Sequence, residues 1–245
     1  MDDDNFSKAY EKGINIYQKK KCIGVLGEKK LHSILKYYIE SDDSFHEIKI
    51  NGLFADVYKE NMIYEIQTSS FNRLRNKLET FLKDYYVTII YPIPYNKWIY
   101  WINEEDGTIT NKRKSPKKGR YIDAFVELYK IKMFLKHKKL TIKLLLIDMN
   151  EYRLLNGWSD DLKKGSTRYE RIPEKIYDTL SLAVFSDYQY FIPDNLETPF
   201  SVKQYSITMN INKRLAGLVL NILNHLEVVS IIGKKKNAYL YQVNM

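Results

Sequence analysis

The stretch GLFADVYKENMIYEIQTSSF, residues 52–71, decides how the rest of the chain is interpreted. Leu53–Tyr58 and Met62–Thr68 are rich in β-branched and aromatic residues and flank a short polar turn, so they predict a β-hairpin. Asp56 lies late in the first strand and Glu65 lies within the second. A tight hairpin is therefore expected to bring these two carboxylates together.

The second strand of the hairpin carries an E-x-Q pair, Glu65 and Gln67. Residues two apart on a strand point to the same face. A carboxylate in a run suited to a core is unfavourable unless it is paired, hydrogen-bonded or bound to a metal. The sequence therefore predicts that Glu65 has a specific partner.

A third carboxylate comes from the helix expected at Val25–Glu40. Glu28 precedes Leu31 and Leu35 by three and seven positions, so it points with them towards the core. Three converging acids repel one another, and a divalent cation relieves that repulsion. Oxygen ligands favour Mg²⁺ or Mn²⁺, and one cysteine and four histidines exclude a cysteine-based zinc site.

Outward from the hairpin, helices and strands alternate, which predicts an α/β domain around one mixed sheet. The strand at Tyr86–Tyr91 is expected to end at Pro92 and Pro94, because proline cannot donate to a ladder. The other expected elements of this half are helices at 1–20, 69–84 and 121–137, strands at 97–102 and 142–149, and a basic loop at 104–120.

The polar, basic residues 152–172 are interpreted as a linker between a first domain, residues 1–151, and a second, residues 173–245. Helical spacing of apolar residues predicts helices in the second domain, and Asn212 is the expected cap of the last one. The predicted elements are helices at 173–190, 200–209 and 213–227 and a hairpin of 228–232 with 238–243.

The segments GEKKLHSIL, GLFADVY and MIYEIQTSSF, within residues 20–103, resemble the PD-(D/E)XK nuclease superfamily. The resemblance implies a restriction-endonuclease-like core and metal-dependent hydrolysis of a phosphodiester. Asp56 and Glu65 would hold the metal, and Glu28 would be an auxiliary ligand. The metal would activate water and neutralise charge on the transition state.

The chain departs from the usual pattern because Gln67 stands where most members of the superfamily have Lys. Neutral Gln orients water only through hydrogen bonds, whereas Lys also stabilises negative charge. Lys77, near the buried face of the following helix, is a candidate to supply that charge. For His32, one turn after Glu28, a ligand or base role stays open beside that of a packed or surface histidine.

Residues 199–243 resemble a winged helix-turn-helix, with two close helices followed by a basic-tipped hairpin. The resemblance implies a small α+β domain whose second helix enters the major groove and whose wing contacts phosphates. The implied base contacts are Lys213, Arg214 and Asn221, and the implied backbone contacts are Lys234, Lys235 and Lys236. A role in protein contacts or dimerisation is the alternative, and a homodimer is left open.

The net charge of +9 suits a polyanionic partner, although AT-rich coding would also produce many lysines. No stretch reaches the roughly 18 apolar residues of a bilayer span, and the acidic start is no signal peptide, so a cytoplasmic protein is expected. The predicted function is a Mg²⁺-dependent DNA endonuclease acting on duplex or branched DNA. The alternatives are a catalytically inactive DNA-binding or regulatory protein and an RNA-binding or RNA-processing protein.

Overall fold

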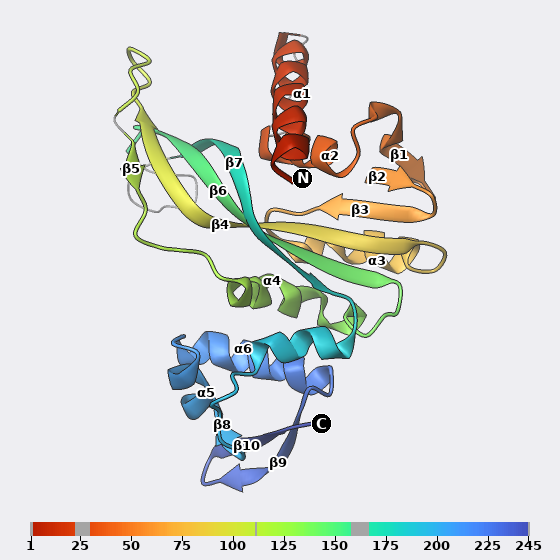
Figure 1. Ribbon diagram of the computed structural model, residues 1–245, viewed down its shortest axis with the longest axis vertical. Coiled ribbons are helices and arrows are strands. Elements are labelled where there is room, and N and C mark those ends of the chain that lie inside the picture. The colour runs from red at the N-terminus through yellow and green to blue at the C-terminus, as the bar shows by residue number, and fades with distance from the viewer. Residues whose placement is uncertain (1, 23–29, 111, 158–166, 245) are drawn as a thin grey trace.

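The computed structural model describes residues 2–22, 30–110, 112–157 and 167–244 (Figure 1). Its α-helices are α1 (Asp2–Cys22), α2 (Lys30–Ile39), α3 (Arg75–Phe81), α4 (Phe125–Leu128), α5 (Val202–Thr208) and α6 (Lys213–His225). Its 3₁₀ helices are η1 (Asp43–Phe45), η2 (Phe71–Leu74), η3 (Tyr121–Ala124), η4 (Tyr129–Phe134) and η5 (Phe185–Phe191). Its strands are β1 (His46–Ile50), β2 (Leu53–Lys59), β3 (Met62–Ile66), β4 (Tyr86–Ile102), β5 (Arg113–Lys114), β6 (Leu140–Leu154), β7 (Arg168–Leu182), β8 (Phe200–Ser201), β9 (Val229–Lys235) and β10 (Ala238–Val243).

In the described part of the chain, seven strands form one mixed sheet in the order β1-β2-β3-β4-β6-β7, with β5 paired to β4. The β1–β2 and β2–β3 pairs are antiparallel, β3, β4 and β6 are parallel neighbours, and β7 returns antiparallel to β6. The parallel neighbours are joined by the helical crossovers through α3 and α4, as such pairs require. The predicted mixed α/β sheet is confirmed.

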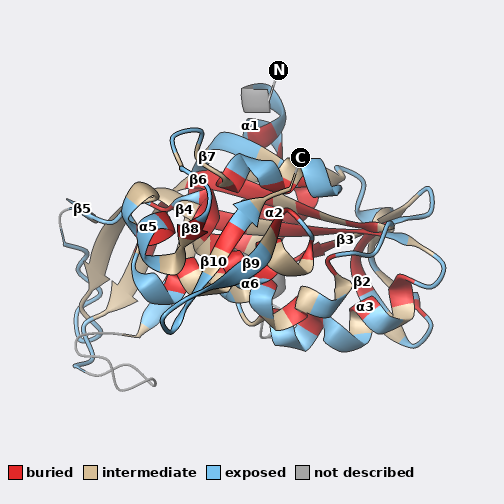
Figure 2. Ribbon diagram, turned by 90° about the horizontal axis from the view of Figure 1, so that it is seen from below, coloured by how far each residue is buried: buried red, intermediate tan, exposed pale blue. Residues whose placement is uncertain are grey.

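The large sheet is covered on both faces because its central strands are apolar on both sides. On one face, Ile66, Ile90 and Leu145 pack with Leu31 and Leu35 of α2. On the other face, the alternate strand residues pack against α3 and α4. The strand residues include Ile63, Ile89 and Leu144, and the helices contribute Leu78 and Phe125. Figure 1 shows the same layers, with α2 above the sheet and α3 and α4 below it, and Figure 2 shows buried residues gathered along the central strands.

Strand β4 runs through Pro92 and Pro94, so the prediction that these prolines end it is wrong. The carbonyl oxygens of Ile90 and Pro94 both face away from β6, since they accept hydrogen bonds from Gln67 and Gly119. Residues 92 and 94 alternate with the positions that bond to β6, so their nitrogens also face away from β6, beyond the end of β3. The missing N–H groups therefore interrupt no ladder bond, which is the setting in which a strand tolerates proline.

The helix predicted at residues 173–190 is wrong, because β7 occupies Arg168–Leu182 and pairs with β6 throughout. The predicted linker at 152–172 is also wrong at both described ends, since Tyr152 pairs with Glu170 and Arg153 with Arg168 in the large sheet. Spacing of Ile176 and Leu180 fits a helix locally, but pairing along β6 overrides it through three register shifts. The large sheet thus continues to residue 182.

The C-terminal module, residues 185–244, contains η5, α5, α6 and a small sheet in the order β8-β10-β9. Asn212 caps α6 as predicted, with its side-chain oxygen accepting the Leu215 N–H at 2.8 Å. The module packs through α6 against α4 and η4 and shares one apolar core with the sheet (Figure 1). The helix predicted at 121–137 is broken into η3, α4 and η4, with Ile131 in a non-helical conformation.

Within the described ranges, no helix has the length and apolar character that a bilayer span requires.

Candidate carboxylate site

Asp56 and Glu65 meet where β2 and β3 separate. The ladder pairs Val57 with Tyr64, so the next positions along the two strands are Asp56 and Glu65. At this point a side chain replaces the backbone acceptor of the ladder, because Asp56 Oδ2 accepts the backbone N–H of Ile66 at 2.7 Å. The hairpin therefore juxtaposes the two carboxylates as the sequence predicts.

Asp56 is 8% exposed and is held from the helical layer above it. His32, on α2, places its Nε2 3.1 Å from Asp56 Oδ2. Burial works to raise the pKa of Asp56, but the His32 hydrogen bond and charge and the charge of Lys77 outweigh it, so the net pKa is lowered. Asp56 is thus the carboxylate of the pair that stays ionised, and His32 is its positioning partner.

Glu65 is 2% exposed and approaches the following helix. Lys77 Nζ, on α3, donates to Glu65 Oε2 at 2.7 Å, while Glu65 Oε1 is buried with no hydrogen-bond partner among the described residues. Burial, followed by the negative charge of Asp56, raises the pKa of Glu65 to about 8 despite Lys77. At neutral pH and without a metal ion, Glu65 holds its proton.

Gln67 lies two residues after Glu65, just past the end of β3. Its side-chain amide donates to the carbonyl of Ser69, and its backbone N–H donates to Ile90 at 3.0 Å. Lys77, in contrast, reaches the carboxylates from α3. The cation at this site therefore comes from the helix after the E-x-Q strand.

The predicted metal ligands are placed in part. Asp56 and Glu65 are adjacent, whereas Glu28 lies outside the described residues. Among the residues that are described, no group of three His, Cys, Asp or Glu side chains could hold a metal ion. The donor set of Asp56 and Glu65 still fits a hard dication, because a buried carboxylate oxygen without a hydrogen-bond partner in the described part of the chain lies beside a second carboxylate.

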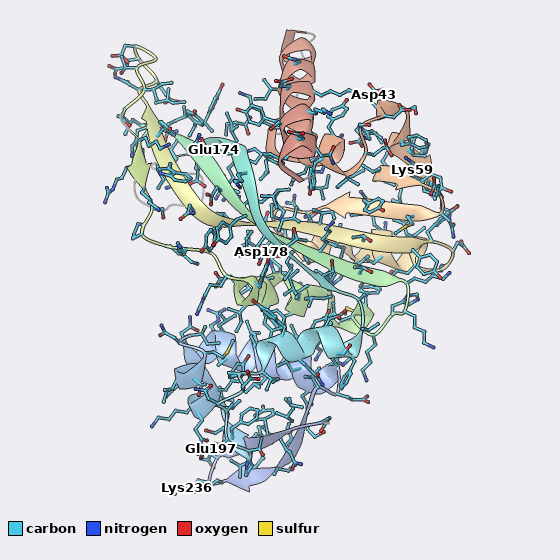
Figure 3. The ribbon with its side chains drawn as sticks, viewed as in Figure 1. Asp43, Lys59, Glu174, Asp178, Glu197 and Lys236 are labelled. Carbon is cyan, nitrogen blue, oxygen red and sulfur yellow. The ribbon has the colours of Figure 1, made fainter. Side chains whose placement is uncertain are left out.

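The residues predicted to contact DNA divide into two groups. Lys213 and Arg214 are exposed in the first turn of α6, and Lys234, Lys235 and Lys236 are exposed in the hairpin. Figure 3 shows Lys236 at the end of the C-terminal module remote from the large sheet.

Asn221 faces the large sheet's helical layer, where its Oδ1 accepts from Lys132 Nζ at 2.9 Å. Nearby, the Arg120 guanidinium donates to the carbonyls of Met209 and Asn210 at 3.1 and 3.2 Å, holding the turn between α5 and α6. The Asn221 side chain is exposed, and its contact with base edges stays a prediction.

One group of functional interest was missed from the sequence. Glu151 is completely buried beneath four basic side chains on β4, β6 and β7. The spacing of Glu151 and Arg153, two apart in a strand-like run, was the available signal, but it fell at the border of the supposed linker.

The fold and this site define a mixed α/β protein with two buried carboxylates at the open end of a β-hairpin. Residues 29–183, more than half of the chain, match the family described as a domain of unknown function, DUF8091, and the protein belongs to that family. The matched region begins just before α2 and ends just after β7, so it contains the large sheet and excludes the C-terminal module.

An uncharacterized protein of Treponema pallidum (strain Nichols) is 30% identical over 182 residues, covering 74% of this chain and 69% of the relative. No solved structure matches the chain.

Proposed function

We propose that this protein is a divalent-metal-dependent deoxyribonuclease whose reaction centre is formed by Asp56, Glu65 and Lys77. The observation that carries the proposal is the repulsion expected between two adjacent buried carboxylates. Two buried carboxylates lie together, and the pKa of Glu65 is raised to about 8 by its burial and then by the charge of Asp56. A dication held between them would let both ionise, which is the usual reason for such a cluster.

The order of elements supports the same proposal. Helix α2, the β1–β2–β3 antiparallel run, α3 and the parallel strand β4 follow in the order that the PD-(D/E)XK resemblance implies. Asp56 and Glu65 occupy the hairpin strands of that order, at the end of β3. The finer assignment of the sheet to a restriction-endonuclease-like core is part of this proposal.

Each residue has a defined task in the proposed reaction. Asp56 is kept ionised by His32 and by the Ile66 N–H, and it fixes one side of the centre. Lys77 is placed to release Glu65 and to offer its ammonium to a phosphoryl oxygen, the task that Lys performs in the strand of other members. When bound by Asp56 and Glu65, Mg²⁺ or Mn²⁺ would supply positive charge to the phosphoryl group and acidify water.

The C-terminal module is proposed to be a winged helix that brings the enzyme to DNA. The succession β8, α5, α6, β9 and β10 supports this, together with three exposed lysines at the hairpin, residues 234–236. The hairpin lysines and the first turn of α6 are exposed and therefore available to phosphates.

The test is cleavage of plasmid, branched and single-stranded DNA by the purified chain with Mg²⁺, Mn²⁺ or EDTA. Asp56→Ala and Glu65→Ala are expected to reduce metal-dependent cleavage by about a hundredfold or more while circular dichroism stays unchanged. Asp43→Ala, which removes an exposed acid in η1, is the matched control and should cleave normally. Absence of cleavage on every substrate would count decisively against the proposal.

The role of Lys77 has its own test. Lys77→Ala should lose cleavage while folding survives, and Lys83→Ala, an exposed lysine just after α3, should cleave as the parent does. Full activity of Lys77→Ala would remove that residue from the centre.

A second candidate function is DNA binding without catalysis. It is favoured by Gln67 in the place of Lys and by the absence, within the described ranges, of a complete three-ligand group. A salt-sensitive gel shift with no metal-dependent cleavage would select it. Competition between duplex DNA and RNA in the same assay would separate an RNA-binding protein from both.

A further inference from the structure

A basic cluster lies on the arm that the large sheet extends beyond the end of β3. The arm comprises residues 95–102 of β4, 148–154 of β6 and 168–175 of β7. Its central residue is Glu151, which pairs with Ile99 on one side and Arg171 on the other. Glu151 is 0% exposed although the arm projects from the body of the molecule (Figure 1).

Four cations from three strands surround this one carboxylate. Arg153 binds Glu151 Oε1 through Nε at 2.7 Å and Nη2 at 2.5 Å, and Arg171 Nε reaches Oε2 at 3.1 Å. Lys97 Nζ lies 3.4 Å from Oε1, and Arg168 Nε lies 3.6 Å from Oε2. Glu151 is therefore the anchor that fixes the direction of the basic groups.

The cluster carries more positive charge than its acid can neutralise. Without counting Arg168, the three cations Lys97, Arg153 and Arg171 against one carboxylate leave a charge of +2 (3 − 1). The neighbouring acid, Glu170, adjoins Arg171 in the strand and therefore points to the other face, where its Oε1 accepts the Arg171 backbone N–H. The cations stay in reach of solvent, with side-chain exposures from 19% for Lys97 and Arg171 to 48% for Arg168.

A surplus of oriented N–H donors is the chemistry that binds phosphate. Each Arg carries about five N–H donors and Lys about three, whereas a carboxylate accepts about four hydrogen bonds. Planar guanidinium groups held by a buried anchor match phosphate oxygens and lose little entropy on binding. We infer that Lys97, Arg153, Arg168 and Arg171 form a binding site for a backbone phosphate of duplex DNA.

The position of the cluster specifies which phosphate it would meet. Lys97 lies seven residues along β4 from Ile90, at the end of β3, which is about 23 Å at roughly 3.3 Å per residue. At about 3.4 Å per nucleotide of one strand, this corresponds to about seven nucleotides from the carboxylate pair. The spacing from the carboxylate pair rests on the proposed function, whereas the binding of phosphate itself does not.

The test measures duplex binding in EDTA by fluorescence anisotropy over a series of salt concentrations. The double variant R153Q/R171Q should bind at least about tenfold more weakly near 0.1 M salt, and the slope of log K against log salt should fall by about 1 to 2. K49Q/K83Q removes the same charge from two exposed lysines of the same sheet domain and should change affinity less than about twofold. R153K/R171K keeps the charge and should restore most of the slope.

A purely structural cluster gives a different result. R153Q/R171Q and R153K/R171K would then lower the thermal unfolding midpoint while the salt slope stayed at the parental value, and the inference would be overturned. Calorimetry with inorganic triphosphate supplies a second arm. Triphosphate binding that the R153Q/R171Q change abolishes, with an unaltered duplex slope, would assign the site to small polyphosphates and overturn the DNA assignment.

The binding assay and the cleavage assay fail separately. A reduced slope in R153Q/R171Q with no cleavage by the parent chain would support the phosphate site and remove the nuclease proposal. Normal cleavage with an unchanged slope would remove the phosphate site alone.

Discussion

Two glutamates of the same sheet are almost equally buried and have opposite acidities. Glu65, beside Asp56 and with Lys77 as its cation, has a pKa raised to about 8. Burial also works to raise the pKa of Glu151, but Arg171, Lys97 and Arg153 outweigh it and hold that pKa at about 2. Burial raises the pKa of both glutamates, and the difference shows that the charges of the neighbours decide whether that effect is outweighed.

The two sites are therefore complementary in chemistry. The hairpin end collects acids and has one bonded cation, so it suits a dication. The arm collects cations around one acid, so it suits an anion. A metal-dependent enzyme acting on a polyanion needs both, and the following predictions test whether the contrast holds in solution.

The largest expected effect follows from removing the charge of Glu151. Glu151→Gln leaves four basic groups without their anchor and should lower the free energy of unfolding by about 3 kcal/mol at pH 7. Glu65→Gln should change it by less than about 1 kcal/mol in EDTA, because Glu65 is already protonated there. Urea unfolding of both variants checks this. Equal destabilisation by the two changes would mean that the contrast in ionisation is wrong.

The second effect is the pH dependence of stability. From pH 4.5 to about 8, unfolded Glu65 is ionised while folded Glu65 keeps its proton, so the folded state binds more protons and stability falls as pH rises. Glu151 acts in the opposite sense: its stabilisation is lost as pH falls from 4.5 towards about 2. We expect the chain to lose about 3 kcal/mol between pH 5 and 8, measured by urea unfolding in EDTA. Glu65→Gln should flatten this region, and an unaltered profile would contradict the assignment.

A smaller effect should come from Lys77→Met, which removes the cation bonded to Glu65. Without that cation, the pKa of Glu65 should rise further, and the upper end of the falling part of the stability profile should extend about one pH unit higher. The same unfolding series measures it. Lys83→Met serves as the control, and a profile that moved equally in both variants would show that the effect comes from net charge alone.

The smallest effect separates the members of the basic cluster. Arg168 is 48% exposed and lies 3.6 Å from Glu151, so Arg168→Ala should lower the free energy of unfolding by about 0.5 kcal/mol or less. Arg171→Ala, at 19% exposure and 3.1 Å, should have the larger effect. Parallel urea titrations rank the two, and the reverse order would show that distance and exposure do not govern this cluster.

The elements with local signals were predictable from the sequence. The helix at α2, the β2–β3 hairpin and the cap at Asn212 each depend on residues within a few positions of one another. The adjacency of Asp56 and Glu65 followed from the hairpin, and Lys77 followed from the buried face of the next helix. The functional meaning of these residues stays a proposal.

The errors share one cause, which is pairing between distant strands. Pro92 was expected to end β4. Its nitrogen faces the edge of β4 that β3 does not cover, because β3 ends at Ile66. Residues 173–182 carry a spacing that also suits a helix, and β6 recruits them into the sheet.

The sequence by itself determined the local elements, the acidic hairpin and the excess of basic residues, since backbone preference and side-chain periodicity act over short distances. Only the tertiary structure decided which acid is charged. Three strands gather Lys97, Arg153, Arg168 and Arg171 around Glu151, whereas the hairpin places Asp56 against Glu65. Electrostatic energy depends on separation in space, and separation along the chain does not reveal it.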